Sequence, residues 1–325
     1  MITWIGRVLV LLVLIPRSYG WGREGHYATC KIAEGYLSED AVAGVTKLLP
    51  LHAEGELAAV CSWADEIRIH HRWSGALHFA DTPDFLCNYS YCRDCHDSAQ
   101  LKDRCVTGGI YNYTKQLKLG PDSGITYNLT EALMFLAHFI GDVHQPLHAG
   151  FLGDLGGNGV TLQWYSQKTN LHRVWDDMII ESALKTYYNG NLMTMIRSIQ
   201  ENMLNDDFDD ISSWDSCDAT VCPDTYVLIL LKSVDCRIMA CYDNVYSLTS
   251  FLLFFYASME VRYASESINL ACKFAYRNAT PGSTLGDDYF VSRLPIVEKR
   301  LAQGGVRLAA VLNRIFNSSL PIATE

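Results

Sequence analysis

The chain has 325 residues, of which 49% are hydrophobic and 19% are charged, and its formal net charge is −10 at neutral pH. This length provides enough material for a buried core, and the apolar fraction excludes an intrinsically disordered protein. The 36 Asp and Glu outnumber the 26 Lys and Arg, which argues against binding of nucleic acid by a basic surface. A polyanionic substrate would need another source of positive charge, such as bound metal ions.

The first 20 residues have the pattern of a secretory signal peptide. Arg7 precedes an apolar run over residues 8–15, and residues 18–20 suit signal peptidase, so we expect a mature chain that begins at Trp21. The apolar run is too short to span a bilayer, and no membrane anchor is expected. Cleavage would remove Arg7 and Arg17 and no acidic residue, which takes the net charge from −10 to −12. We expect the protein in the secretory pathway, either extracellular or in the vacuolar and endomembrane system.

The 11 cysteines agree with an oxidising compartment. Four of them lie close together in the sequence, where disulfides are favoured and a zinc–thiolate site is the alternative: Cys87, Cys92, Cys95 and Cys105. Sequons also provide candidate acceptors for N-glycans on exposed loops. Their asparagines are Asn88, Asn112, Asn128, Asn278 and Asn317.

Most of the chain is predicted to be helical. Residues 130–140 are apolar almost all round, which indicates a buried helix, and residues 160–165 are the best candidate for a strand. Amphipathic spacing predicts helices over 173–184 and 192–204, and a long helix over 294–316 with an interruption near Gly304 and Gly305. No repeat and no Pro- or Ser-rich linker divides the chain. We therefore expect one mainly α domain over residues 21–325.

Histidine and aspartate recur at spacings typical of metal sites. His138 and Asp142 are four residues apart in the apolar helix, so both lie on one face, and His172 and Asp176 repeat this spacing. The proline after the first pair should turn His148 toward the same cavity. A single pair could be a helix-face ion pair, but burial of such a pair without partners is costly. The imidazole and carboxylate ligands suit zinc, although manganese or iron would fit the same atoms.

Six blocks of the sequence are similar to the zinc-dependent single-strand nucleases of plants and fungi, in particular to the plant bifunctional nucleases. These blocks are residues 21–26, 62–68, 77–83, 138–148, 170–176 and 284–289. The resemblance covers essentially all of residues 21–226 and 263–316. It implies a mainly α, disulfide-stapled fold of the zinc-dependent nuclease and phospholipase C type, and we expect a monomer.

The resemblance implies three zinc ions in one cleft. The residues that match the family ligands are Asp65, His78, His138 and Asp142 for the first ion; His148, His172 and Asp176 for the second; and Trp21, His26 and Asp142, which bridges two ions, for the third. Trp21 would bind through its carbonyl oxygen and its α-amine, which exists only after the signal peptide is removed. No ligand role matches the remaining histidines: His52, His70, His71, His96 and His144.

The resemblance also implies an endonuclease that cleaves RNA and single-stranded DNA to 5′-phosphorylated products and has 3′-nucleotidase activity. Asp65 would orient the attacking water, and Arg68 would stabilise charge on the non-bridging oxygens, with a surface ion pair as the alternative role for Arg68. Phe79 would stack on an unpaired base and Asp81 would contact the base edge. The alternatives are a zinc phospholipase C-like phosphodiesterase, which Phe79 and Asp81 disfavour, and a zinc-stabilised glycoprotein without turnover.

Residues from about 227 to 262 depart from the family pattern. Without them, the block that ends at Tyr226 would run directly into residues 264–272, as in family members. Apart from Thr249, residues 247–255 can be encoded by pyrimidine-rich codons, as expected for a translated tract before a splice acceptor. We interpret this insertion as a retained intron. The alternatives are a genuine surface insertion and a membrane anchor, although the apolar run over 251–259 is too short to span a bilayer. If the insertion prevents folding of the site, the chain would be an inactive isoform.

Overall fold

The structure is a computed structural model that describes residues 20–119, 126–205, 208, 211–215 and 259–317. Residues 1–19 of the predicted signal peptide and residues 227–258 of the predicted insertion lie outside this part of the chain. The described chain is mainly helical, as predicted. No helix in the described ranges is long and apolar enough to cross a membrane.

The α-helices are α1 (Arg23–Glu34), α2 (Glu39–Leu48), α3 (Trp63–Ile67), α4 (Tyr91–Asp94), α5 (Val106–Leu119), α6 (Leu129–His144), α7 (Leu171–Arg173), α8 (Ile179–Tyr187), α9 (Leu192–Leu204), α10 (Ser212–Asp215), α14 (Met259–Leu270) and α15 (Asp287–Phe316). The short 3₁₀ and π segments are η1 (Leu51–Ala53), η2 (Ala58–Val60), η3 (Arg72–His78), η5 (Pro146–Ala149), η6 (Val174–Met178) and η7 (Ala271–Ala275). The strands are β1 (Thr161–Trp164), β2 (Gln167–Asn170) and β3 (Thr284–Leu285).

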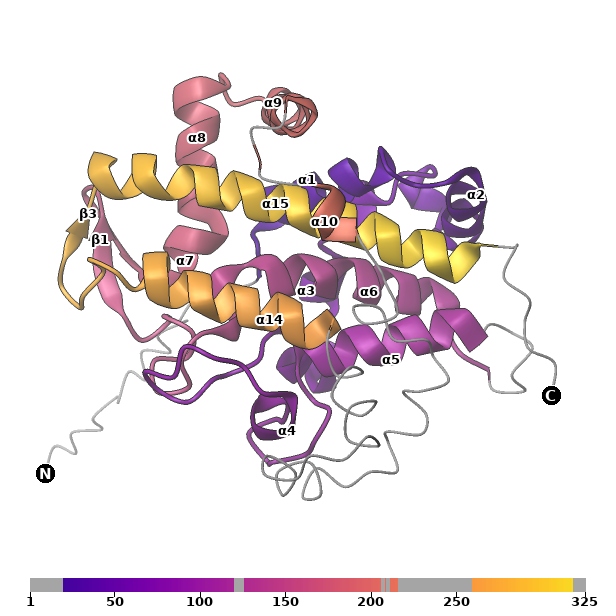
Figure 1. Ribbon diagram of the computed structural model, residues 1–325, viewed down its shortest axis with the longest axis horizontal. Coiled ribbons are helices and arrows are strands. Elements are labelled where there is room, and N and C mark those ends of the chain that lie inside the picture. Colours follow the sequence, from indigo (N-terminus) through magenta and orange to yellow (C-terminus); the bar gives the residue numbers. More distant parts are fainter. Residues whose placement is uncertain (1–19, 120–125, 206–207, 209–210, 216–258, 318–325) are drawn as a thin grey trace, which may run out of the picture.

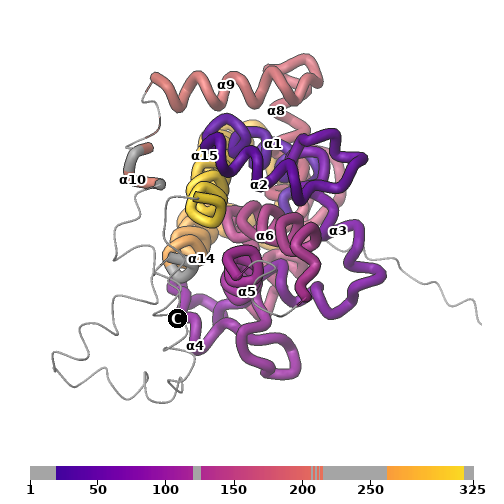
Figure 2. Tube along the Cα trace, turned by 90° about the vertical axis from the view of Figure 1, so that its right-hand side faces the viewer, coloured from indigo at the N-terminus to yellow at the C-terminus, as the bar shows by residue number. Residues whose placement is uncertain are grey.

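Helix α6 forms the centre of the fold. The side chain of Asn128 caps its N-terminus by accepting a hydrogen bond from the backbone N–H of Glu131 at 3.2 Å. Every residue from 132 to 144 is buried, which confirms the predicted buried helix. Helices α1, α5, α14 and α15 pack against α6 and surround it in the end-on view of Figure 2. The helix ends at His144 because Pro146 cannot continue it.

Helix α15 runs along the length of the molecule (Figure 1) without the predicted interruption. The expected break at Gly304 and Gly305 is wrong, because both residues are helical and buried. A Cβ atom on Gly305 would lie 2.5 Å from Cγ2 of Ile32 on α1. The two glycines therefore permit close packing between α1 and α15.

A small sheet and a continuous helical segment follow α6. Strand β1 confirms the predicted strand within one residue at each end, and it pairs antiparallel with β2 and parallel with β3. After β2, helices α7 and α8 are joined by the π turn η6, so the predicted helix over 173–184 is helical throughout but is not regular. Helix α9 has the predicted bounds of 192–204.

Three disulfides between described cysteines connect segments of the chain, two of them over long sequence separations and one within a loop. They are Cys30–Cys61, Cys87–Cys272 and Cys95–Cys105, and Cys92 is disulfide-bonded as well. The predicted disulfide-stapled fold is confirmed, and the zinc–thiolate alternative for the cysteine cluster is wrong. The first of these disulfides connects α1 to the segment before α3.

Candidate metal centre

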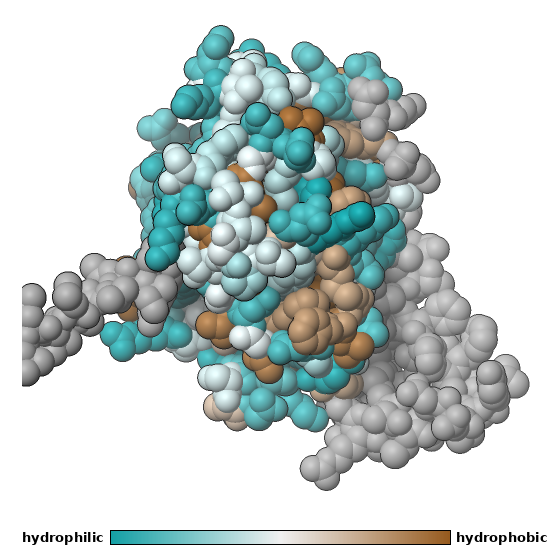
Figure 3. Space-filling view, turned by 90° about the vertical axis from the view of Figure 1, so that its left-hand side faces the viewer, coloured by the Kyte–Doolittle hydropathy of each residue, from teal (hydrophilic) through white to brown (hydrophobic). Residues whose placement is uncertain are grey.

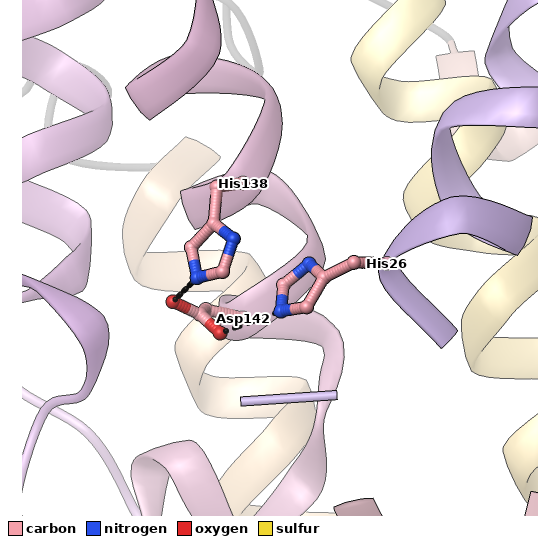
Figure 4. A group of neighbouring side chains, drawn as sticks. All are labelled: His26, His138 and Asp142. Atoms are coloured by element: carbon pink, nitrogen blue, oxygen red, sulfur yellow. Dashed lines mark ion pairs between the residues drawn. The ribbon is translucent and has the colours of Figure 1, made fainter. Parts of the chain in front are cut away.

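Helices α1 and α6 bring a buried His–His–Asp group together (Figure 4). His138 and Asp142 lie one turn apart on α6, and Nε2 of His138 is 3.1 Å from Oδ2 of Asp142. His26 projects from α1, with Nε2 3.3 Å from Oδ1 of Asp142 and its ring stacked on His138 at 3.8 Å between centroids. Gly141 allows this approach, because a Cβ atom there would lie 2.8 Å from Nδ1 of His26.

Asp65 and His78 extend this group. Asp65 lies on α3, and His78 is the last residue of η3. Nδ1 of His78 is 3.0 Å from Oδ2 of Asp142, 3.1 Å from Nε2 of His138 and 3.5 Å from Oδ1 of Asp65. All four residues are buried. The structure thus brings together the four residues predicted to hold the first ion.

A second group adjoins the first. His148 comes from η5, His172 from α7 and Asp176 from the π turn η6. Nε2 of His172 is 3.4 Å from Oδ2 of Asp176, and Nε2 of His148 is 3.9 Å from Oδ1 of the same carboxylate. Nδ1 of His148 is 3.4 Å from Oδ1 of Asp142, which places the two groups side by side.

Backbone carbonyl groups orient three of the imidazole rings. Nδ1 of His138 donates to the carbonyl oxygen of Cys61 at 2.8 Å, and Nδ1 of His148 donates to that of His78 at 2.6 Å. Nδ1 of His172 donates to the carbonyl oxygen of Gly156. These hydrogen bonds place each Nε2 atom toward a carboxylate of the cluster, Asp142 for His138 and Asp176 for His148 and His172, which is the usual outer-shell arrangement of histidine ligands.

Many polar atoms of the two groups are buried without a hydrogen-bond partner among the described residues. They include both ring nitrogens of His26, Nε2 of His148, Oδ1 of Asp65 and both carboxylate oxygens of Asp142. Such burial is costly unless another partner satisfies these atoms. Divalent cations would do so, since imidazole nitrogens and carboxylate oxygens are suitable ligands. Three groups, two of which share His138, each bring their ligand atoms within 4.8 Å of one another.

The electrostatics of the cluster keep most of its imidazoles neutral. Burial, followed by the charge of His138, lowers the pKa of His26 to about 4, and burial with the charge of His148 lowers that of His172 to about 3. Burial also lowers the pKa values of His78 and His148. Neutral imidazoles are the form that binds metal, so these four rings are ready to act as ligands near neutral pH.

Comparison with known proteins agrees with this arrangement. The model of the S1/P1 nuclease family matches residues 21–317. The chain belongs to the S1/P1 nuclease family. It is 58% identical to endonuclease 4 of Arabidopsis thaliana, over 97% of this chain and 95% of that protein. It is also 27% identical to nuclease P1 of Penicillium citrinum, over 92% of this chain and 99% of that protein. The protein is therefore a metal-dependent nuclease that hydrolyses phosphodiester bonds.

The other predicted site residues of the nuclease are Arg68, Phe79 and Asp81, and Arg68 lies close to a proposed ligand. Nη1 of Arg68 is 4.0 Å from Oδ1 of Asp65, and the positive charge of Arg68 contributes to the low pKa of His172. Phe79 follows His78 directly and is 38% exposed. Asp81 is partly buried two residues further on, where burial raises its pKa to about 7.

The histidines without a predicted ligand role and the sequon asparagines of the nuclease are not members of the His and Asp groups described above. His144 is buried, but its Nδ1 donates to the carbonyl oxygen of Ile140 and its Nε2 accepts from Arg307 of α15. His52 and His70 are exposed, and His71 and His96 are partly exposed. The sequon asparagines are all exposed: Asn88, Asn112, Asn128, Asn278 and Asn317.

Gln145 contacts a predicted ligand, although the sequence patterns did not predict a role for it. Gln145 is completely buried, and its Nε2 donates to Oδ1 of Asp176 at 2.5 Å. Its Oε1 accepts from the backbone N–H of Leu147 at 2.6 Å. The signal in the sequence is an amide side chain next to the proline that ends α6, inside a block that contains three predicted ligands.

Proposed function

We propose that this nuclease is a secreted, zinc-dependent endonuclease that hydrolyses RNA and single-stranded DNA to 5′-phosphorylated products and also dephosphorylates 3′-nucleotides. The convergence of three buried His and Asp groups carries this proposal. These groups contain no cysteine, and sets of imidazole and carboxylate ligands suit zinc. Bound cations would also supply the positive charge that a polyanionic substrate needs on a chain with a net charge of −10.

Three zinc ions fit the residues as follows. The first ion would be held by Asp65, His78, His138 and Asp142. The second ion would be held by His148, His172 and Asp176. The third would lie at His26, Asp142 and Trp21. Support for Trp21 comes from its neighbour, because a Cβ atom on Gly20 would lie 1.8 Å from Oδ1 of Asp142 and 2.8 Å from Nε2 of His26.

Removal of the signal peptide would complete the third site. Cleavage after Gly20 converts the peptide nitrogen of Trp21 into an α-amine, whose pKa of about 7.7–8.0 lets a metal displace its proton near neutral pH. The buried Trp21 side chain and the 3.0 Å hydrogen bond from the N–H of Gly22 to the carbonyl oxygen of Asp176 hold this amine in place. The uncleaved precursor should therefore lack a complete third site.

The chain's own residues would divide the chemistry among them. Zinc, when bound, supplies Lewis-acid charge for the phosphate oxygens and lowers the pKa of water. Oδ1 of Asp65, which is buried without a hydrogen-bond partner in the described chain, would orient the attacking water or accept its proton. Arg68 would stabilise the charge that develops on the non-bridging oxygens. Phe79 would stack on an unpaired base, and Asp81 would contact the edge of that base.

The test is the zinc content of the secreted, signal-cleaved protein, measured by elemental analysis, with hydrolysis of single-stranded RNA assayed on the same sample. Close to three zinc ions per chain and cleavage that a chelator abolishes would support the proposal. Substoichiometric metal without cleavage would reject it for this 325-residue chain. A variant with two extra glycines before Trp21, which add no Cβ atom beside Asp142, provides a control, because it should lose the third zinc and keep the other two.

A further inference from the structure

A short parallel ribbon leads away from the metal groups. The backbone N–H of Ala80 donates to the carbonyl oxygen of His148 at 2.7 Å, and that of Thr82 donates to the carbonyl oxygen of Gly150 at 2.9 Å. The N–H of Leu152 then donates to the carbonyl oxygen of Thr82 at 2.8 Å. Residues 78–82 and 148–152 therefore run side by side, and each segment begins with a histidine of the metal cluster.

An aromatic ledge, in which one of three rings is largely exposed, lies at the far end of this ribbon. We define it by Phe85, Phe151 and Tyr276. The ring of Phe151 stacks on Tyr276 with 4.6 Å between centroids and 10° between planes, and Phe85 lies 5.8 Å from Phe151. The side chain of Phe85 is 89% exposed. In Figure 3, an apolar area interrupts a largely hydrophilic face of the molecule.

The ledge is rigid rather than a loose loop tip. The backbone N–H of Phe151 donates to Oη of Tyr276 at 3.0 Å, and Oη donates to Oδ1 of Asp154 at 3.0 Å. The N–H of Gly153 donates to Oδ1 of Asp84 at 2.7 Å, and the Cys87–Cys272 disulfide follows two residues after Phe85. Holding a large exposed ring in place in this way lowers the entropy lost on binding a ligand.

Phe85 also has a backbone conformation that is unusual for an aromatic residue. Its φ is 63°, in the left-handed region where residues with a side chain are disfavoured. Such conformations cost about 1–3 kcal/mol and cluster at functional sites and ligand clamps. A solvent-exposed ring in a strained, well-supported position indicates a binding role.

We propose that the aromatic ledge binds an unpaired base of the substrate, two or three nucleotides from the phosphate that is cleaved. This inference rests on the proposed function. The other side of the ribbon is extended, from Phe79 to Thr82, which pairs with Phe151. These three residue steps span about 10 Å, which corresponds to about three base steps of a stacked strand. Asp84 and Asp154 flank the ledge and repel phosphates, so a base, not the backbone, contacts Phe85.

The test compares the wild type, Phe85→Ala and Phe85→Trp on single-stranded DNA decamers in which one base at a time is replaced by an abasic site. In the wild type, loss of the base that occupies the ledge should raise KM about tenfold, the fold-change that corresponds to about 1.4 kcal/mol of stacking. For the intact decamer, Phe85→Ala should have a KM about as high as the wild type has for the decamer that lacks the ledge base. Removal of that base should not raise the KM of Phe85→Ala further. Phe85→Trp should preserve the sensitivity.

The controls separate this inference from the proposed function. Cleavage of 3′-nucleotides, which cannot reach the ledge, should be the same in all three proteins, and Leu204→Ala, at an exposed apolar residue on α9, should leave every KM unchanged. A wild type that cleaves neither substrate overturns the proposed function. If the wild type cleaves both substrates and Phe85→Ala responds to each abasic site as the wild type does, the base-binding role of the ledge is overturned and the proposed function stands.

Discussion

The side-chain amide of Gln145 donates a hydrogen bond to Oδ1 of Asp176 at 2.5 Å, and both side chains are buried. The same amide accepts the N–H of Leu147 through Oε1, so it cannot turn without breaking a second hydrogen bond. Oδ2 of Asp176 is left to face His172 at 3.4 Å. Gln145 thus fixes which oxygen of this carboxylate is presented to the second metal group, as outer-shell residues of metal sites do.

We predict that Gln145→Leu weakens metal binding at the second group by about 10- to 100-fold, because Asp176 is no longer oriented. Titration of the protein with a zinc chelator should release this ion first, while the ions of the first and third sites keep their wild-type affinity. Gln163→Leu, at an exposed position on β1, is the matched control. Equal chelator profiles for Gln145→Leu and the wild type would contradict the orienting role.

The spacing of His138 and Asp142 predicts their shared helix face correctly because helical geometry is local. The buried helix α6 and the disulfide staples are likewise predictable from composition. The glycines of α15 are a different case: as sequence they indicate a break, and only the contacts of Gly304 with Thr29 and of Gly305 with Ile32, both on α1, explain them. Tertiary contacts of this kind overrule local preferences and leave no trace in a single sequence.

The same limit applies around the metal centre. Asp176 is predictable as a candidate ligand, but its place in a π turn is not, since π turns are rare and interrupt helices singly. The partnership of Gln145 with Asp176 joins residues 31 positions apart. The aromatic ledge combines residues from three segments, so its parts are ordinary in the sequence and become conspicuous only when they lie together.

A buried charge network supports the C-terminal end of α6. Nε of Arg300 donates to the carbonyl oxygen of His144 at 2.9 Å, and Glu266 of α14 accepts from both Arg300 and Arg307 at 3.0 and 2.6 Å. We predict that Glu266→Gln lowers the free energy of unfolding by about 3 kcal/mol, because two buried arginines lose their counter-charge. This value is at the low end for broken buried pairs, since the Glu266 side chain keeps 27% of its surface exposed.

The pH dependence of stability checks the same network. Burial acts to raise the pKa of Glu266, but the hydrogen bond from Arg307 and the charges of Arg300 and Arg307 lower it below 4.5. Its contribution is therefore fully present above about pH 4.5 and is lost as the pH falls below that value. Urea unfolding from pH 7 to pH 3 should show a shallower acid loss for Glu266→Gln than for the wild type. Glu39→Gln, an exposed residue of α2, should follow the wild type.

Asp81 should make base preference depend on pH. Burial raises its pKa, the charge of His96 lowers it and that of Asp154 raises it, for a value of about 7. The carboxyl is protonated below pH 7, and above it the carboxylate can accept two N–H groups from guanine. We predict that kcat/KM for guanine relative to adenine dinucleotides rises about tenfold from pH 6 to pH 8, as expected for a charged hydrogen bond. Asp81→Asn should show a flat ratio, and a pH-dependent ratio in this variant would contradict the assignment.

The insertion at about 227–262 should be dispensable for the metal centre. The nine proposed metal ligands all precede it, and the chain that follows it returns directly to the core at Tyr263, which is buried against Arg307 with 4.4 Å between the guanidinium carbon and the ring centroid. Joining Tyr226 to Tyr263 would remove Cys236 and Cys241, which can mispair with the native cysteines, and the apolar run over 251–256.

We therefore predict that deletion of residues 227–262 keeps the full complement of zinc and the cleavage of single-stranded RNA, and that it raises the yield of secreted, monomeric protein. Zinc analysis and size-exclusion chromatography on both forms provide the comparison. Transcript reads should cross the Tyr226–Tyr263 junction if the segment is a retained intron. Uniform read coverage of codons 227–262 in mature message, together with loss of zinc on deletion, would establish the segment as part of the nuclease, because an intron-derived insertion cannot be needed to form the metal centre.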